Sequence, residues 1–136
     1  MKLDQEYTSS CRKKLEKALL DEEPFLVTHR KISMWFNILN DVFFEKKIPK
    51  FNKFKILKRK TDYFASCNIN YDGAKVETLL EIYRKFQTKK DFLEILAHEM
   101  IHLHDHWVYE DMAHGKRFFK WKKKFNELGL RLQIKY

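Results

Sequence analysis

The chain has 136 residues, the length of one domain, and 44% of them are hydrophobic and 15% aromatic. This composition excludes an intrinsically disordered chain, and the lack of any apolar run longer than three residues excludes a membrane-spanning helix and an export signal. The net charge of +9 favours contact with a polyanion such as nucleic acid. We therefore expect an intracellular protein, in the cytoplasm or on the nucleoid, or in the host cell's cytoplasm if the chain is viral.

Residues 1–25 are nearly neutral and differ in character from the rest of the chain. Ser9 or Ser10 is predicted to cap a short helix there, which should end before Pro24. We interpret this segment as an N-terminal appendage to one domain that spans residues 26–136.

A second helix is predicted to begin at Thr28 or Ser33. Apolar residues recur at spacings of three and four from Ile32 to Phe43, which is the pattern of an amphipathic helix with one face in a core. Pro49 follows this segment and should end it.

Three strands are predicted next, over residues 54–59, 63–71 and 76–83, because apolar and polar residues alternate there. Asp72-Gly73 supplies the positive φ angles of a tight turn, so the last two strands should form an antiparallel hairpin.

A longer helix is predicted from Thr88, whose spacing to Asp91 is that of a variant capping box. Its apolar stripe runs from Phe92 to Trp107, near which the helix should end. After a linker, apolar residues again recur at helical spacing up to Leu128, and Gly129 is a natural stop. Residues 131–136 are expected to add a last short strand. The fold class that follows is α+β, with N-terminal helices, a sheet of about three strands that includes a hairpin, and two further helices.

The longer helix carries the sequence His98-Glu99-Met100-Ile101-His102. Histidines four residues apart on a helix lie about 40° apart around its axis and about 6 Å apart along it, so both imidazoles can reach one cation. This HExxH pattern is typical of zinc peptidases, in which the glutamate faces the water that the metal activates. The pattern therefore predicts a Zn²⁺ site with Glu99 as its catalytic residue.

The third ligand should arrive from a separate element. His114 is the only histidine after the predicted helix, and Glu110 and Asp111 are the oxygen alternatives.

Other histidines on the same helix are badly placed for the same ion. His104 lies about 240° around the axis from His98, and His106 lies about 12 Å further along it. We interpret both, together with Asp105, as surface or supporting residues, although Asp105 lies near the His98 face and would be able to orient a ligand.

Basic residues are concentrated in two stretches: eight between positions 46 and 60 and six between 116 and 124, with no acidic residue in either. Such stretches suit phosphate contacts, and the competing interpretation is a solvated surface. The candidate nucleic-acid contacts are Lys58, Arg59, Lys60, Lys122, Lys123 and Lys124. Three aromatic residues are candidates for base stacking, with buried core positions as the favoured interpretation: Tyr63, Phe64 and Trp107.

The segment from Ala97 to His102, followed by His114-Gly115-Lys116-Arg117-Phe118 and then Leu128-Gly129, resembles the SprT-like metallopeptidase family, which includes the Spartan proteases. The resemblance covers about residues 30–130. It implies a small zincin-like domain with zinc on His98, His102 and His114 and with Glu99 as general base. The better-known members cleave proteins that are bound or crosslinked to DNA, and DNA stimulates the cut. This chain departs from them because its two isolated cysteines cannot form a zinc ribbon.

We therefore expect a zinc endopeptidase of DNA repair, acting on proteins bound or crosslinked to DNA, with single-stranded or junction-containing DNA as partner and no membrane partner. An extended substrate is expected to pair with an exposed edge strand, for which residues 76–83 are the first candidate. The alternative is a nucleic-acid-binding module with a structural or inactive zinc site.

Overall fold

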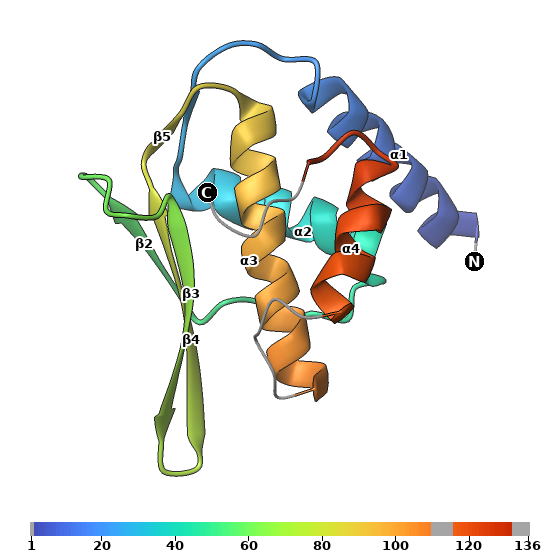
Figure 1. The fold of residues 1–136 in the computed structure, drawn as a ribbon. Helices are drawn as coiled ribbons and strands as arrows, with labels where there is room; N and C mark the ends of the chain where they lie inside the picture. Colours follow the sequence, from blue (N-terminus) through green and yellow to red (C-terminus); the bar gives the residue numbers. More distant parts are fainter. Residues whose placement is uncertain (1, 110–115, 132–136) are drawn as a thin grey trace.

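The protein is an α+β domain in the computed structural model, which describes residues 2–109 and 116–131 (Figure 1). The fold class predicted from the sequence is therefore confirmed. In chain order the elements are α1 (Lys2–Ala18), β1 (Phe25–Leu26), α2 (His29–Phe44), β2 (Lys53–Leu57), β3 (Ala65–Asp72), β4 (Lys75–Tyr83), β5 (Lys85–Phe86), α3 (Lys89–Tyr109) and α4 (Lys116–Asn126).

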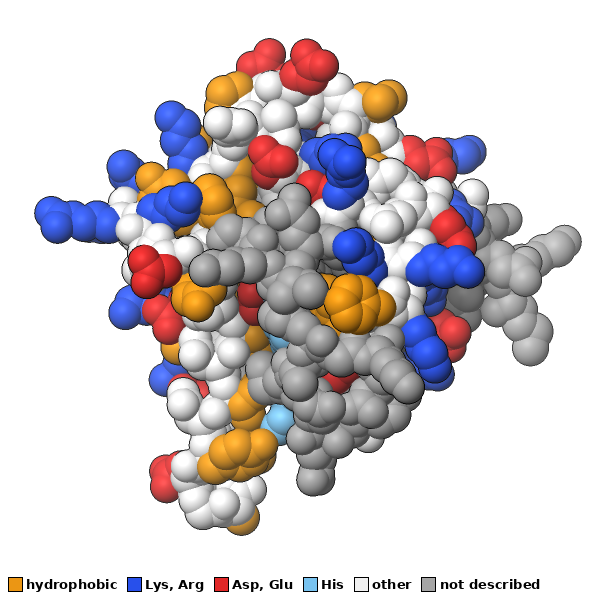
Figure 2. All heavy atoms as spheres, in the orientation of Figure 1, with side chains coloured by type: hydrophobic (Ala, Val, Ile, Leu, Met, Phe, Trp, Pro, Cys, Tyr) orange, Lys and Arg blue, Asp and Glu red, His pale blue; other side chains and the backbone are white. Residues whose placement is uncertain are grey.

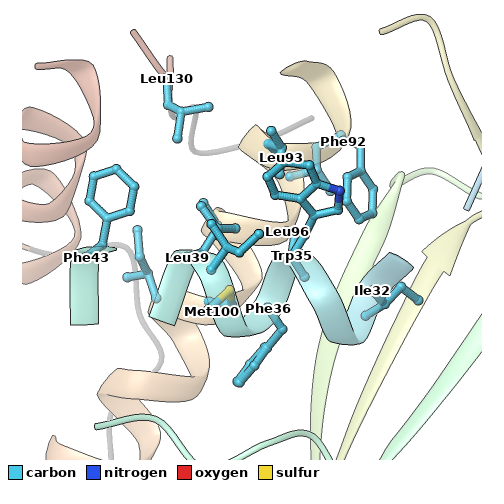
Figure 3. Close-up of a cluster of buried hydrophobic side chains, with 14 of the residues drawn as sticks. Ile32, Trp35, Phe36, Leu39, Phe43, Phe92, Leu93, Leu96, Met100 and Leu130 are labelled. Atoms are coloured by element: carbon cyan, nitrogen blue, oxygen red, sulfur yellow. The ribbon is translucent and has the colours of Figure 1, made fainter. Parts of the chain in front are cut away.

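Helices α2 and α3 form the centre of the core. Thr28 caps α2, as predicted, because its hydroxyl accepts a hydrogen bond from the backbone N–H of Lys31 at 3.1 Å. Figure 3 shows the apolar stripe of α2 facing that of α3. The buried side chains labelled there are Ile32, Trp35, Phe36, Leu39 and Phe43 of α2, Phe92, Leu93, Leu96 and Met100 of α3, and Leu130.

Leu39 lies in the middle of this interface and is fully buried. We expect Leu39→Ala to lower the free energy of unfolding by about 2–5 kcal/mol, because it removes buried methyl groups and leaves a cavity. Leu20→Ala is the matched control, since Leu20 is 82% exposed and its truncation should change the free energy by less than about 0.5 kcal/mol. Urea denaturation of both variants measures the difference, and equal effects would contradict the packing described for α2.

The three-stranded sheet has the order β2-β4-β3. β3 and β4 form the predicted antiparallel hairpin, in which Asp72 pairs with Lys75 and Gly73 has φ +61°. β2 pairs with β4 in parallel, with Phe54 opposite Leu80. β4 therefore lies in the middle of the sheet, and the prediction that residues 76–83 form an exposed edge is wrong. The edges of this sheet are β2 and β3.

A second, two-stranded sheet joins β1 to β5, with Phe25 opposite Phe86. The sequence patterns did not predict these two-residue strands, because alternation cannot be read over so short a length.

Helix α1 packs against α2. Leu15 is fully buried, and the Thr8 hydroxyl donates to the Asp41 carboxylate at 3.0 and 3.1 Å. The helix begins at Lys2, so the prediction of a short helix capped by Ser9 or Ser10 is wrong, and both serines lie inside it. The domain boundary at residue 25 stays a prediction.

Helix α4 packs against the C-terminal end of α2. Phe125 stacks on Phe43 with ring centroids 3.9 Å apart, and the Lys124 ammonium donates to the Phe43 carbonyl at 2.7 Å. The chain leaves the helix as predicted at Gly129, which has φ +93°. Of the strand predicted over residues 131–136, all but Arg131 lies outside the described residues.

Across residues 2–109 and 116–131, none of the helices combines the length and the apolar character that a bilayer crossing requires.

Candidate metal centre

Helix α3 carries the two histidines of the motif. The Thr88 hydroxyl accepts the N–H of Asp91 at 3.2 Å, so the predicted cap is confirmed. The apolar stripe of α3 is buried as far as Leu103, whereas Trp107 is 44% exposed. The prediction that the stripe extends to Trp107 is therefore wrong, because the core cluster ends before the last turns of α3.

His98 and His102 lie side by side, with their Nε2 atoms 3.0 Å apart. Two nitrogens that bind one zinc ion at about 2.0–2.1 Å are about 2.8–3.4 Å apart for angles between 90° and tetrahedral. The rings are only 5% and 9% exposed, so the two donor atoms converge at a nearly buried point. Neutral imidazole nitrogens in this arrangement are donors that zinc prefers, and the pair fits a metal ion.

Glu99 lies on the side of α3 that faces the edge strand β3. The backbone N–H of Cys67 donates to its carboxylate, and the side chain is 6% exposed. Burial raises the pKa of Glu99 to about 8, against the opposing effect of the Cys67 hydrogen bond. Burial, and then the charge of Glu99, raise the pKa of the Cys67 thiol. A cation held by the neighbouring histidines would favour the ionised carboxylate.

Phe118 of α4 covers the histidine pair. Its ring lies 4.9 Å from the His98 ring and 6.0 Å from the His102 ring, measured between centroids, and it is fully buried. The sequence shows Phe118 at helical spacing and in the segment that resembles the family, but no local pattern shows which side chains such a residue covers. Its ring therefore places an apolar surface that excludes water next to the two histidine rings.

The other histidines of α3 have partners away from the pair. His104 Nδ1 lies 3.0 Å from the Asp105 carboxylate, and His106 Nδ1 lies 3.4 Å from the Tyr71 hydroxyl of β3. Asp105 and His106 are buried, so they are not surface residues as the sequence allowed. The hydrogen bond of Asp105 goes to His104, not to the His98 face.

The predicted third ligand, His114, and its alternatives Glu110 and Asp111 lie outside the described residues. Within the part of the chain that the structure describes, no group of three or more His, Cys, Asp or Glu side chains is arranged to hold a metal ion. The structure thus brings together two of the predicted ligands, His98 and His102, while the predicted catalytic residue, Glu99, follows His98 in the chain and contacts β3 through Cys67.

The basic residues that follow β2 have neighbours that the sequence did not predict. Leu57 pairs with Tyr83 at the end of the parallel β2–β4 ladder, and the Arg84 N–H donates to the Leu57 carbonyl at 3.2 Å. Five exposed basic residues therefore gather at one end of the sheet, and we call them the sheet-end basic cluster. Its members are Lys58, Arg59, Lys60, Arg84 and Lys85.

The second predicted basic group, Lys122, Lys123 and Lys124, lies on α4. The ammonium groups of Lys122 and Lys124 lie over the rings of Phe119 and Trp121, at 5.9 and 5.1 Å from the ring centroids. Their contact with nucleic acid stays a prediction.

The candidate stacking residues are more exposed than the favoured core interpretation required. Tyr63 is 51% exposed and Trp107 is 44% exposed, so the core interpretation is wrong for both, whereas Phe64 is half-buried.

Fold and site together define a small α+β domain that holds two converging histidines and a buried carboxylate on one helix, beside the edge of a sheet. The model of the SprT-like family matches residues 32–136, and the chain belongs to this family. Membership is consistent with a protease-like function. A search of curated proteins found no match.

Proposed function

We propose that the protein is a zinc-dependent endopeptidase with a zincin-like site that cleaves proteins bound or crosslinked to DNA. The observation that carries this proposal is the 3.0 Å separation of the Nε2 atoms of His98 and His102 at a nearly buried point, with Glu99 on the same helix. Family membership and the sheet-end basic cluster support it.

Each residue of the site has a distinct role in this proposal. His98 and His102 would hold the zinc ion together with His114, and the bound ion would lower the pKa of water and polarise a peptide carbonyl. Glu99 takes a proton from the attacking water and passes it to the leaving amine. Phe118 keeps bulk water away from the histidine rings, which strengthens the electrostatic interactions at the site.

The edge strand β3 is the surface on which we place an extended substrate. Because the Cys67 N–H points to Glu99, Cys67 occupies a position of the ladder whose backbone groups face away from β4. Residues two apart in a strand direct their backbone groups to the same side, so those of Ala65 and Ile69 also face away from β4. A peptide that pairs with β3 would thus pass beside Glu99, and main-chain pairing makes few demands on sequence.

Metal content and cleavage, measured on the same preparation, test the proposal. We expect a stoichiometric amount of zinc by elemental analysis, and cleavage of a DNA-binding protein that single-stranded DNA stimulates and a chelator abolishes. Added zinc should restore the activity. A hydrogen bond between two neutral imidazoles also gives a 3.0 Å separation, and a metal-free chain would favour that arrangement.

The second candidate function is a nucleic-acid-binding module with structural or inactive zinc. The burial of Glu99 favours this alternative, since a carboxylate that is 6% exposed and bonded to the Cys67 N–H has little access to an attacking water. Zinc without cleavage under any condition would support it.

A further inference from the structure

A pocket of about 560 Å³ opens beside the start of α3, at the same end of the sheet as the sheet-end basic cluster. Its volume lies in the range of sites for small organic groups. The lining residues come from the β2–β3 and β4–α3 segments and from the first turns of α3: Lys60, Phe64, Tyr83, Lys85, Phe86, Gln87, Asp91, Glu94 and Ile95.

One wall of the pocket is aromatic. The ring of Phe64 lies 6.2 Å from that of Tyr83 and 5.4 Å from that of Phe86, measured between centroids. The ammonium of Lys60 lies 4.0 Å from the Phe64 ring centroid. One face of this ring is therefore covered by an exposed side chain and not by the core. Lys60 is exposed, and its long side chain can move aside for a flat ligand.

Other residues of the pocket lining are polar. Glu94 is buried, and its carboxylate accepts the backbone N–H of Arg131 at 2.5 Å. Burial raises the pKa of Glu94. With Asp91 and the amide of Gln87, the pocket offers hydrogen-bond acceptors and donors in addition to an aromatic ring.

The rim of the pocket is basic. Lys60 and Lys85 line it directly, and Lys58, Arg59 and Arg84 lie next to them at the end of the β2–β4 ladder. Figure 2 shows Lys and Arg side chains interspersed with hydrophobic ones at the upper left, over this end of the sheet. The lining itself has two lysines and two carboxylates, and the adjoining Lys58, Arg59 and Arg84 against Asp62 leave a net charge of +2 around the pocket. The net charge therefore favours an anionic ligand over a basic side chain.

We propose that this pocket binds one base of a single-stranded nucleic acid, with the base on the Phe64 ring and the flanking phosphates on Lys60 and Lys85. A nucleotide consists of a flat aromatic ring, a hydrogen-bonding edge and a phosphate, and the pocket has a matching group for each. Gln87 and Glu94 face the base edge. This inference rests on the nucleic-acid part of the proposed function.

The position of the pocket gives the binding a consequence for cleavage. Glu94 precedes His98 by four residues on α3, which corresponds to about 6 Å along the helix axis. A base held in the pocket would thus lie about one helical turn from His98 and about two turns from His102. Protein attached to the strand that carries this base is then delivered to the peptidase site.

Binding of two fluorescent oligonucleotides tests the proposal, one single-stranded and of mixed sequence, the other an abasic strand of the same length and charge. We expect the unaltered chain to bind the strand with bases about tenfold more tightly than the abasic strand. Phe64→Leu should bring this ratio close to one and leave the abasic affinity unchanged, because it removes the aromatic face and keeps an apolar side chain. Tyr7→Leu is the matched control, since Tyr7 is an exposed aromatic residue of α1 with a lysine ammonium 5.0 Å over its ring, and it is not part of the pocket lining.

A second variant keeps the test valid if Phe64→Leu does not fold. Lys60→Ala with Lys85→Ala alters two exposed residues, and it should weaken both oligonucleotides and reduce the slope of log affinity against log salt by about 1.4. Equal binding of both strands by the unaltered chain overturns the proposal, as does an unchanged slope. Loss of affinity for a lysine-containing peptide in Phe64→Leu, with oligonucleotide binding intact, assigns the pocket to protein substrate and also overturns it. These binding experiments do not test the peptidase proposal. That proposal would fail if the chain lacked zinc or did not cleave protein, and neither result changes the ratio of the two oligonucleotide affinities.

Discussion

Replacing Glu99 with glutamine is expected to lower the rate of peptide cleavage by about 10²–10⁴-fold, the usual contribution of a general base, while zinc content and fold remain. Glutamine has the size of glutamate and can still accept the Cys67 N–H, so the packing beside β3 should be kept. It cannot take a proton from the attacking water. The measurement is kcat/KM on a protein substrate, with zinc determined on the same sample.

Glu77→Gln provides the control for this substitution. Glu77 lies on β4 in a solvent-exposed ion pair with Lys53, at 3.4 Å, so the same chemical change there should leave cleavage at the level of the unaltered chain. Cleavage at full rate by zinc-loaded Glu99→Gln would show that Glu99 is not the base. Loss of zinc in this variant would instead assign Glu99 a structural role.

Features set by neighbours in the chain were predictable from the sequence. Thr28 and Thr88 cap α2 and α3 because capping depends on a side chain and an N–H three residues later. Asp72-Gly73 produced the hairpin for a similar local reason. The convergence of His98 and His102 also follows from helix geometry alone, since residues four apart share a face.

Features set by partners distant in the chain were not predictable in this way. The parallel pairing of β2 with β4 joins Phe54 to Leu80, and neither segment carries a local sign of it. That pairing placed β4 inside the sheet and made β3 the edge beside α3. It also brought Arg84 and Lys85 to Lys58–Lys60, so the basic cluster is larger than any run in the sequence.

The third metal ligand is predicted from the sequence of residues 110–115. The structure accounts for two converging nitrogens, and the described histidines nearest to them in the chain, His104 and His106, have Asp105 and Tyr71 as partners. Two nitrogens alone do not complete a tetrahedral zinc site, which needs three protein ligands when a position stays open for water. The remaining donor is expected from residues 110–115, which contain Glu110, Asp111 and His114.

His114→Ala is expected to lower the affinity for zinc by more than about 100-fold and to abolish cleavage. Loss of a supporting hydrogen-bond partner costs about 10–100-fold in metal affinity, and loss of a direct ligand should exceed that range. Competition with a chromogenic chelator measures the affinity without any need for activity. The control variants are Glu110→Gln and Asp111→Asn, each of which removes the charge of one alternative ligand and keeps its size. If either control loses zinc while His114→Ala retains it, the third ligand is a carboxylate and the assignment of His114 is wrong. If all three retain zinc, the third donor comes from outside this segment, because the ion would still need a ligand beyond His98 and His102.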